Sequence, residues 1–69
     1  GSEIPENQLP AAISTAIKSN YANWKIDDVF KVEEDGNISY VVELDGNRDK
    51  HVYYSADGKL VKETADDDA

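Results

Sequence analysis

The sequence predicts an α+β fold in two layers, with one N-terminal helix packed on a four-stranded antiparallel β-meander. Apolar residues recur with helical spacing between Leu9 and Tyr21, and they alternate with polar residues after Trp24. Turn-forming residues separate the alternating segments, and no connection is long enough for a parallel crossover. The apolar stripe of the helix is therefore expected to cover the inner face of the sheet.

Length and composition restrict the class of protein. A chain of 69 residues forms one small domain. Its 15 acidic and 7 basic side chains give a net charge of −8, which argues against nucleic acid and anionic membranes as partners. No apolar run approaches the roughly 18 residues of a membrane-spanning helix, so membrane insertion is not expected. The chain has no cysteine, which excludes disulfides, thiolate metal sites and thiol nucleophiles.

The predicted helix begins near Pro10, where the missing N–H of proline costs nothing, and it ends between Asn20 and Asn23. Trp24 follows at the junction with the sheet, where we expect it to cover one end of the core. One face of the helix carries the apolar stripe of Leu9, Ala12, Ile13, Ala16, Ile17 and Tyr21.

The first predicted strand covers residues 25–34 and contains an irregularity. Phe30 and Val32 are assigned to its inner face and Val29 to its outer face. A bulge near Asp27 and Asp28 is expected, because it keeps their carboxylates out of the core.

Three further strands are expected over residues 38–44, 50–55 and 59–63. Asp35-Gly36-Asn37 is a strong signal for a tight hairpin turn before the first of them. In the last strand Leu60 and Val61 compete for the inner face, so its register stays open. The inner residues of the other two strands are Ile38, Tyr40, Val42, Leu44, Val52 and Tyr54.

The chain divides into three segments. Residues 1–8 are expected to be a flexible lead-in, in which Gly1-Ser2 is typical of the remnant of a cleaved tag. Residues 9–63 form the single folded domain. Residues 64–69 are an acidic tail, which we expect to be disordered because it has too few apolar groups to pack.

Several short motifs follow one another along the chain. They are Leu9-Pro10-Ala11-Ala12, Tyr21, Lys25-Ile26, Asp35-Gly36-Asn37, Tyr40-Val41-Val42-Glu43-Leu44, Val52-Tyr53-Tyr54 and Asp57-Gly58-Lys59-Leu60-Val61. In their order and spacing these motifs resemble the PepSY-like domain family, which is related in fold to beta-lactamase inhibitory protein. The resemblance extends from about Leu9 to Glu63, nearly all of the segment expected to be ordered.

This resemblance implies an exported bacterial protein, periplasmic or at the cell surface, whose signal peptide has been removed. It also implies a non-catalytic role, with inhibition of a protease or another enzyme proposed for some relatives. Many such proteins carry two repeats, whereas only one fits this sequence. The double concave sheet of beta-lactamase inhibitory protein is therefore not expected, and the family has no active-site motif to transfer.

The outward side chains of the sheet form the candidate surface for a protein partner. Aliphatic and aromatic residues flanked by an acid and a histidine have the composition of an interface core. Cross-strand pairs of valine and tyrosine also stabilise a sheet that has no partner, so a plain sheet surface is the alternative. The candidate residues are Val29, Val41, Glu43, His51 and Tyr53.

No catalytic, cofactor or metal site is predicted. A general base needs a nucleophile or water held within about 3 Å, and nothing in the pattern around the one histidine, His51, provides it. Asp45, Asn47 and Asp49 resemble the start of a calcium loop. An EF-hand, however, requires glycine and glutamate at positions where this chain has Lys50 and Ala56.

Three functions are therefore compared. The first is a non-enzymatic protein-binding module of the bacterial cell envelope, inhibitor-like and without a cofactor, which acts through its open sheet face. The second is an architectural repeat of a larger envelope protein with no separate ligand. The third is weak calcium binding at residues 45–49, which predicts a higher melting temperature in millimolar calcium.

Overall fold

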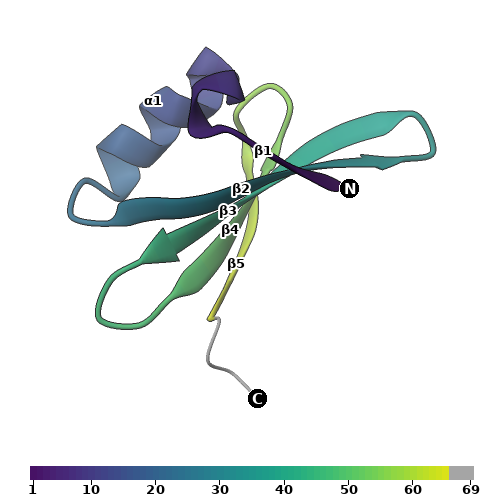
Figure 1. Cartoon of the computed structure of the whole chain (residues 1–69). Coiled ribbons are helices and arrows are strands. Elements are labelled where there is room, and N and C mark those ends of the chain that lie inside the picture. Colours follow the sequence, from purple (N-terminus) through teal and green to yellow (C-terminus); the bar gives the residue numbers. More distant parts are fainter. Residues whose placement is uncertain (66–69) are drawn as a thin grey trace.

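The computed structural model describes residues 1–65. A short strand, β1 (Ser2–Ile4), and a 3-10 helix, η1 (Glu6–Gln8), precede the α-helix α1 (Ala11–Asn20). Four longer strands follow (Figure 1). They are β2 (Lys25–Glu34), β3 (Asn37–Asp45), β4 (Lys50–Ser55) and β5 (Leu60–Ala65). No helix in the described part of the chain is long and apolar enough to cross a membrane.

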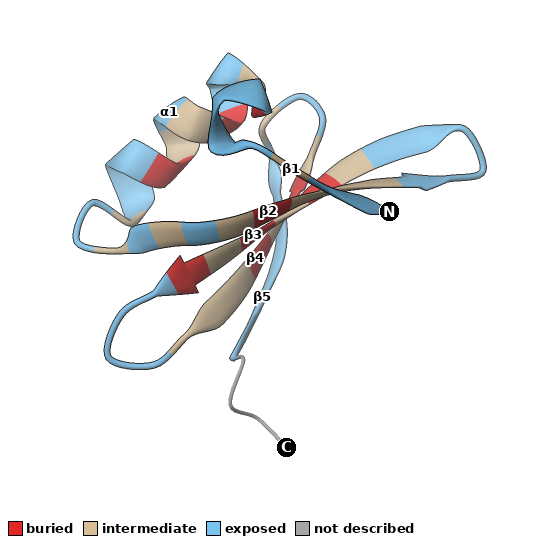
Figure 2. Cartoon of the chain, viewed as in Figure 1, coloured by how far each residue is buried: buried red, intermediate tan, exposed pale blue. Residues whose placement is uncertain are grey.

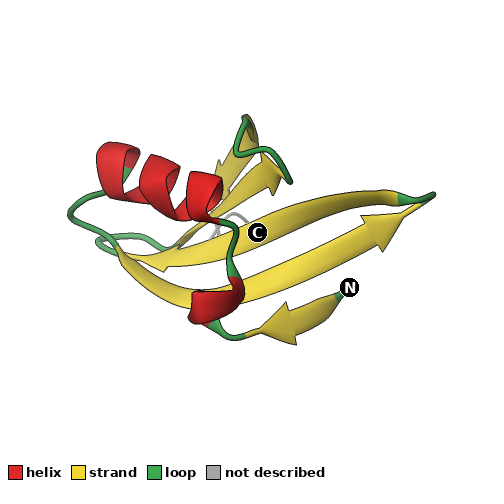
Figure 3. Cartoon of the chain, turned by 90° about the horizontal axis from the view of Figure 1, so that it is seen from above, coloured by secondary structure: helices red, strands yellow, loops and turns green. Residues whose placement is uncertain are grey.

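All five strands form one antiparallel sheet in chain order, and α1 lies across one face of it (Figure 3). This confirms the α+β class, but the predicted number of strands is one too few. Residues 2–4, expected to be part of a flexible lead-in, instead pair with residues 29–31 of β2. Ile4 lies opposite Val29 and packs against the core, so apolar burial adds to the ladder hydrogen bonds that hold β1 in place.

The core lies between α1 and the inner face of the sheet (Figure 2). Ile13 and Ile17 of α1 are buried, as the helical stripe predicts, and Leu9 joins them from just before the helix. The residues that they meet on the sheet are Val29, Tyr40, Val42, Leu44, Val52 and Tyr54.

The predicted bulge in β2 is present, since the register with β3 shifts between Ile26 and Asp28. The predicted faces of the following residues, however, are inverted. Val29 is only 2% exposed and belongs to the core, whereas Phe30 and Val32 lie on the opposite face. The physical reason is the side-chain period of a strand, because one inserted residue exchanges the two faces for every residue beyond it.

The register of β5, which the sequence left open, is set by a second bulge. Leu60 pairs with Tyr54 and Lys62 with Tyr53, so Val61 is the extra residue of this bulge. Neither apolar residue fills the core, because Leu60 is 52% and Val61 62% exposed. Residues 64 and 65 of the predicted tail extend β5, and the predicted disorder of residues 66–69 lies outside the described residues.

Candidate functional site

The candidate site is the face of the sheet that points away from α1, which we call the outer face. No element of residues 1–65 covers it (Figures 1 and 3). Because the strands are in register, each contributes one residue to a straight row across this face. This central row consists of Glu3, Phe30, Val41, Tyr53 and Lys62.

The middle of the central row is apolar and its two ends are charged. Phe30, Val41 and Tyr53 are half-buried by their cross-strand neighbours. Lys62 places its Nζ 4.6 Å from the centroid of the Tyr53 ring, a cation–π geometry that orients the phenol. The row therefore offers an aromatic–aliphatic strip on a rigid scaffold of hydrogen-bonded strands.

A second row beside the central row is polar and contains Asp28, Glu43, His51 and Thr64. His51 Nε2 lies 3.9 Å from Glu43 Oε2. Asp27, the bulged residue, adds another carboxyl group, and one oxygen each of Asp27, Asp28 and Glu43 lies within 4.8 Å of the other two.

Glu3 of the central row belongs electrostatically to this group of acids. Its pKa is raised by a hydrogen bond with Asp28 and by the negative charge of that residue, with smaller effects from burial and from Asp27. We refer to Glu3, Asp27, Asp28 and Glu43 as the carboxylate cluster. It occupies the β1–β3 side of the outer face.

The structure brings four of the five predicted site residues together. Val41 and Tyr53 are neighbours in the central row, and Glu43 and His51 are neighbours in the second row. Val29 does not belong to the site, because it lies in the core, and Phe30 takes its place. The correct face of Val29 follows from the geometry of the β2–β3 turn. Asp35 and Gly36 both have positive φ and form a two-residue turn that places Glu34 opposite Asn37. Counting back along both strands from this pair sets Val29 opposite Val42, which was predicted to face the core.

The residues that resemble a calcium loop have different surroundings in the structure. Asp45 ends β3 opposite Lys25, whereas Asn47 and Asp49 line a groove. Within residues 1–65, the acids that come closest as a group of three are Asp27, Asp28 and Glu43.

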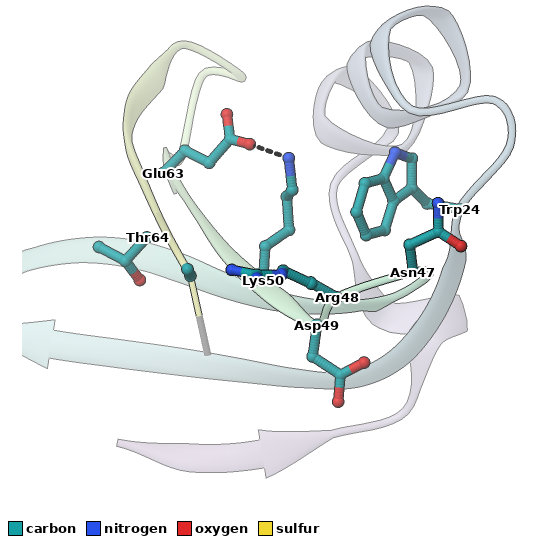
Figure 4. A pocket seen from close by; sticks show the side chains of 8 residues that line it. Trp24, Asn47, Arg48, Asp49, Lys50, Glu63 and Thr64 are labelled. Atoms are coloured by element: carbon teal, nitrogen blue, oxygen red, sulfur yellow. Dashed lines mark hydrogen bonds and ion pairs between the residues drawn. The ribbon is translucent and has the colours of Figure 1, made fainter. Parts of the chain in front are cut away.

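The groove lies at the open end of the core and has a volume of about 500 Å³ (Figure 4). Lys50 reaches into it with Nζ 4.5 Å from the Trp24 ring centroid and forms an ion pair with Glu63. Glu63 also accepts a hydrogen bond from the Tyr21 hydroxyl at 3.2 Å. Trp24 packs against the end of the core as predicted, whereas the charged contacts around it were not predicted.

The contacts of Glu63 predict how stability depends on pH. The hydrogen bond from Lys50 holds the pKa of Glu63 below its ordinary value of 4.5. A lowered carboxyl pKa stabilises the fold above the ordinary value, and this contribution is lost as the pH falls through the pKa of the folded state. Glu63→Gln is therefore expected to lose less stability than the wild type on acidification below about pH 4.5, measured by urea unfolding.

Glu34→Gln is the matched control for this experiment, because it removes one negative charge at the exposed end of β2. It is expected to keep the acid dependence of the wild type. If the free energy of unfolding fell equally steeply with pH in both variants, the assigned role of the Lys50–Glu63 pair would be contradicted.

A protein-family model described as "Putative beta-lactamase-inhibitor-like, PepSY-like" matches residues 1–62, which include β1–β4, α1 and the first half of β5. No curated protein matches the chain.

Proposed function

The chain belongs to the PepSY-like family, and from this membership we propose that it is a non-enzymatic protein-binding module of the bacterial cell envelope. The outer face is the proposed binding surface, with Phe30, Val41 and Tyr53 as its apolar centre and Glu43 and His51 at its rim. The beta-lactamase-inhibitor-like description of the family favours a protein as the ligand.

The observation that carries the proposal is the uncovered central row. Three adjacent apolar side chains on a sheet face with no covering element resemble half of a sheet-packing interface. The strands hold these side chains in fixed positions before a partner arrives, so little conformational entropy is lost on binding. Aromatic residues at the centre of a patch contribute most of the binding energy in protein interfaces, which makes Tyr53 and Phe30 the proposed anchors.

The proposed location is outside the cytoplasm, because PepSY-like proteins are typically extracytoplasmic. An envelope location fits a chain without cysteine, since its fold does not depend on the redox state of the compartment.

Replacing Tyr53 by glutamate is the direct test of this function. Tyr53→Glu is expected to abolish binding, because it removes an aromatic anchor and places a charge that must be desolvated at the centre of the surface. The measurement is affinity capture from a bacterial envelope extract with the immobilised wild-type domain and the variant side by side. A captured enzyme would then be assayed with and without the domain, which tests inhibition directly.

Val61→Glu provides the control, since it makes the same change of charge at an apolar residue that is 62% exposed on β5. A protein retained by the wild type and by Val61→Glu, but not by folded Tyr53→Glu, would support the proposal. Empty lanes for all three folded proteins would overturn it, and the architectural repeat would become the leading hypothesis. Circular dichroism of each domain before immobilisation verifies the fold.

A further inference from the structure

We infer that the partner of the outer face is a basic protein segment that presents a lysine or arginine beside an apolar side chain. This inference rests on the proposed function, because it specifies the chemistry of the partner for the same surface. Its basis is a juxtaposition within the sheet, in which the apolar strip of the central row directly adjoins the carboxylates of the second row.

The charges on the outer face are unevenly distributed. The carboxylate cluster lies on β1, β2 and β3, whereas Lys62 and His51 lie on β5 and β4. Lys25 lies opposite Asp45 across the β2–β3 pair, so these two charges offset each other. The remaining field over the β1–β3 side is negative and adds to the net charge of −8, which steers a basic partner toward this side.

The acids of the cluster repel one another, and a partner cation would relieve that repulsion. A hydrogen bond with Asp28 is the largest cause of the raised pKa of Glu3, and the negative charges of Asp28 and Asp27 also contribute to it. One oxygen from each of the Asp27, Asp28 and Glu43 side chains lies within 4.8 Å of the other two, so a positive nitrogen at their centre would lie no more than about 2.8 Å from each, within reach of a charge-assisted hydrogen bond. One ammonium or guanidinium group can therefore contact Asp27, Asp28 and Glu43 together.

The distance from this cluster to the apolar strip determines the form of the partner. Phe30 is two residues from Asp28 on β2, and Val41 is two residues from Glu43 on β3, so each pair is separated by about 7 Å along its strand. In an extended partner segment, residues two positions apart are separated by the same distance. When the partner's basic residue contacts the carboxylate cluster, the side chain two positions away therefore reaches the apolar strip. This spacing favours a polypeptide over a free ion.

A second copy of this chain fits the surface less well. Each copy carries a charge of −8, and face-to-face packing would bring two carboxylate clusters into one interface. The cost of bringing like charges together favours a basic partner of different sequence.

The test is an NMR titration of the ¹⁵N-labelled domain with a capped peptide of alternating lysine and phenylalanine. A peptide with glutamate in place of lysine is titrated in parallel. The lysine peptide is expected to shift the amide signals of Asp28, Phe30, Val41 and Glu43, and the glutamate peptide is expected to leave them unchanged. Adding salt should weaken the binding, because the attraction is electrostatic at an exposed face.

Two charge-matched double variants give the test its specificity. Asp28→Asn combined with Glu43→Gln is expected to weaken binding of the lysine peptide by about tenfold or more, since it removes two charge-assisted contacts. Glu33→Gln combined with Glu34→Gln removes the same charge at the far end of β2 and should keep the affinity within about twofold. The amide spectrum of each free protein verifies that it is folded.

The remaining outcomes overturn the inference in distinguishable ways. Equal binding of both peptides at Phe30, Val41 and Tyr53 would retain the proposed function and refute the basic partner. Equal weakening by the two double variants would refute the role of the cluster. Concentration-dependent shifts of the outer face without peptide would identify a second copy as the occupant. Saturable shifts of the cluster on adding calcium chloride, without any response to the lysine peptide, would identify a cation site.

Discussion

Gly58→Ala is expected to lower the free energy of unfolding by roughly 2–4 kcal/mol, measured by urea denaturation. Gly58 has φ +91°, a conformation that costs a residue with a side chain about 1–2 kcal/mol. A Cβ atom at this position would also lie 2.8 Å from the Ala12 Cβ and 3.2 Å from the Ala12 carbonyl carbon. The β4–β5 turn would have to move away from α1, and contacts around the helix would be lost.

Gly36→Ala separates the cost of the backbone conformation from the cost of the steric clash. Gly36 has φ +81°, but a Cβ atom there would have no neighbour within 4 Å. This variant is therefore expected to lose about 1–2 kcal/mol, the cost of the backbone conformation alone. Equal losses for the two variants would contradict close packing of the β4–β5 turn on the helix.

Ile13→Ala is expected to destabilise the domain by about 3 kcal/mol, because it removes a large side chain at the centre of the helix–sheet interface. Ile13 is 0% exposed and lies among the buried residues of the sheet. A domain of 69 residues has a total stability of only about 3–10 kcal/mol, so this variant is expected to lose between about a third and all of its stability. Thermal and urea unfolding followed by circular dichroism would measure the change.

Ile38→Ala is the matched control, since the same side chain is shortened where it is already 36% exposed on β3. Its expected cost is below about 1 kcal/mol. Similar losses for Ile13→Ala and Ile38→Ala would contradict the position of α1 over the sheet.

The helix and the three hairpin-linked pairs among β2–β5 were predictable because their signals are local. The stripe through Ile13 and Ile17 has the helical period, and the Asp35–Gly36 turn lies between two alternating segments. β1 was not predictable in this way, because it has three residues and its partner lies more than 20 residues away in β2. A strand this short has no period, and its pairing depends on where α1 returns the chain to the sheet.

The candidate site was predictable only where the strand phase was certain. Val41, Glu43, His51 and Tyr53 lie on strands with regular alternation, and all four were placed on the correct face. Val29 was misplaced because the bulge shifts the phase within β2. The carboxylate cluster was missed for related reasons. Glu43 was placed correctly, but its neighbours are Glu3 of the unpredicted β1, the bulged Asp27, and Asp28, whose position depends on the bulge.

The order of the strands also bears on how the domain folds and opens. β2–β5 form consecutive hairpins with short connections, so each pair can form from contacts close in sequence, a topology associated with rapid folding. β1 pairs with β2 across a longer segment of the chain that contains α1, and the closure of this longer loop costs more entropy. As a three-residue edge strand, β1 can detach at a lower free energy than the rest of the sheet. When it detaches it removes Glu3 from the outer face, so a partner that binds Glu3 also holds the N-terminal strand in the sheet.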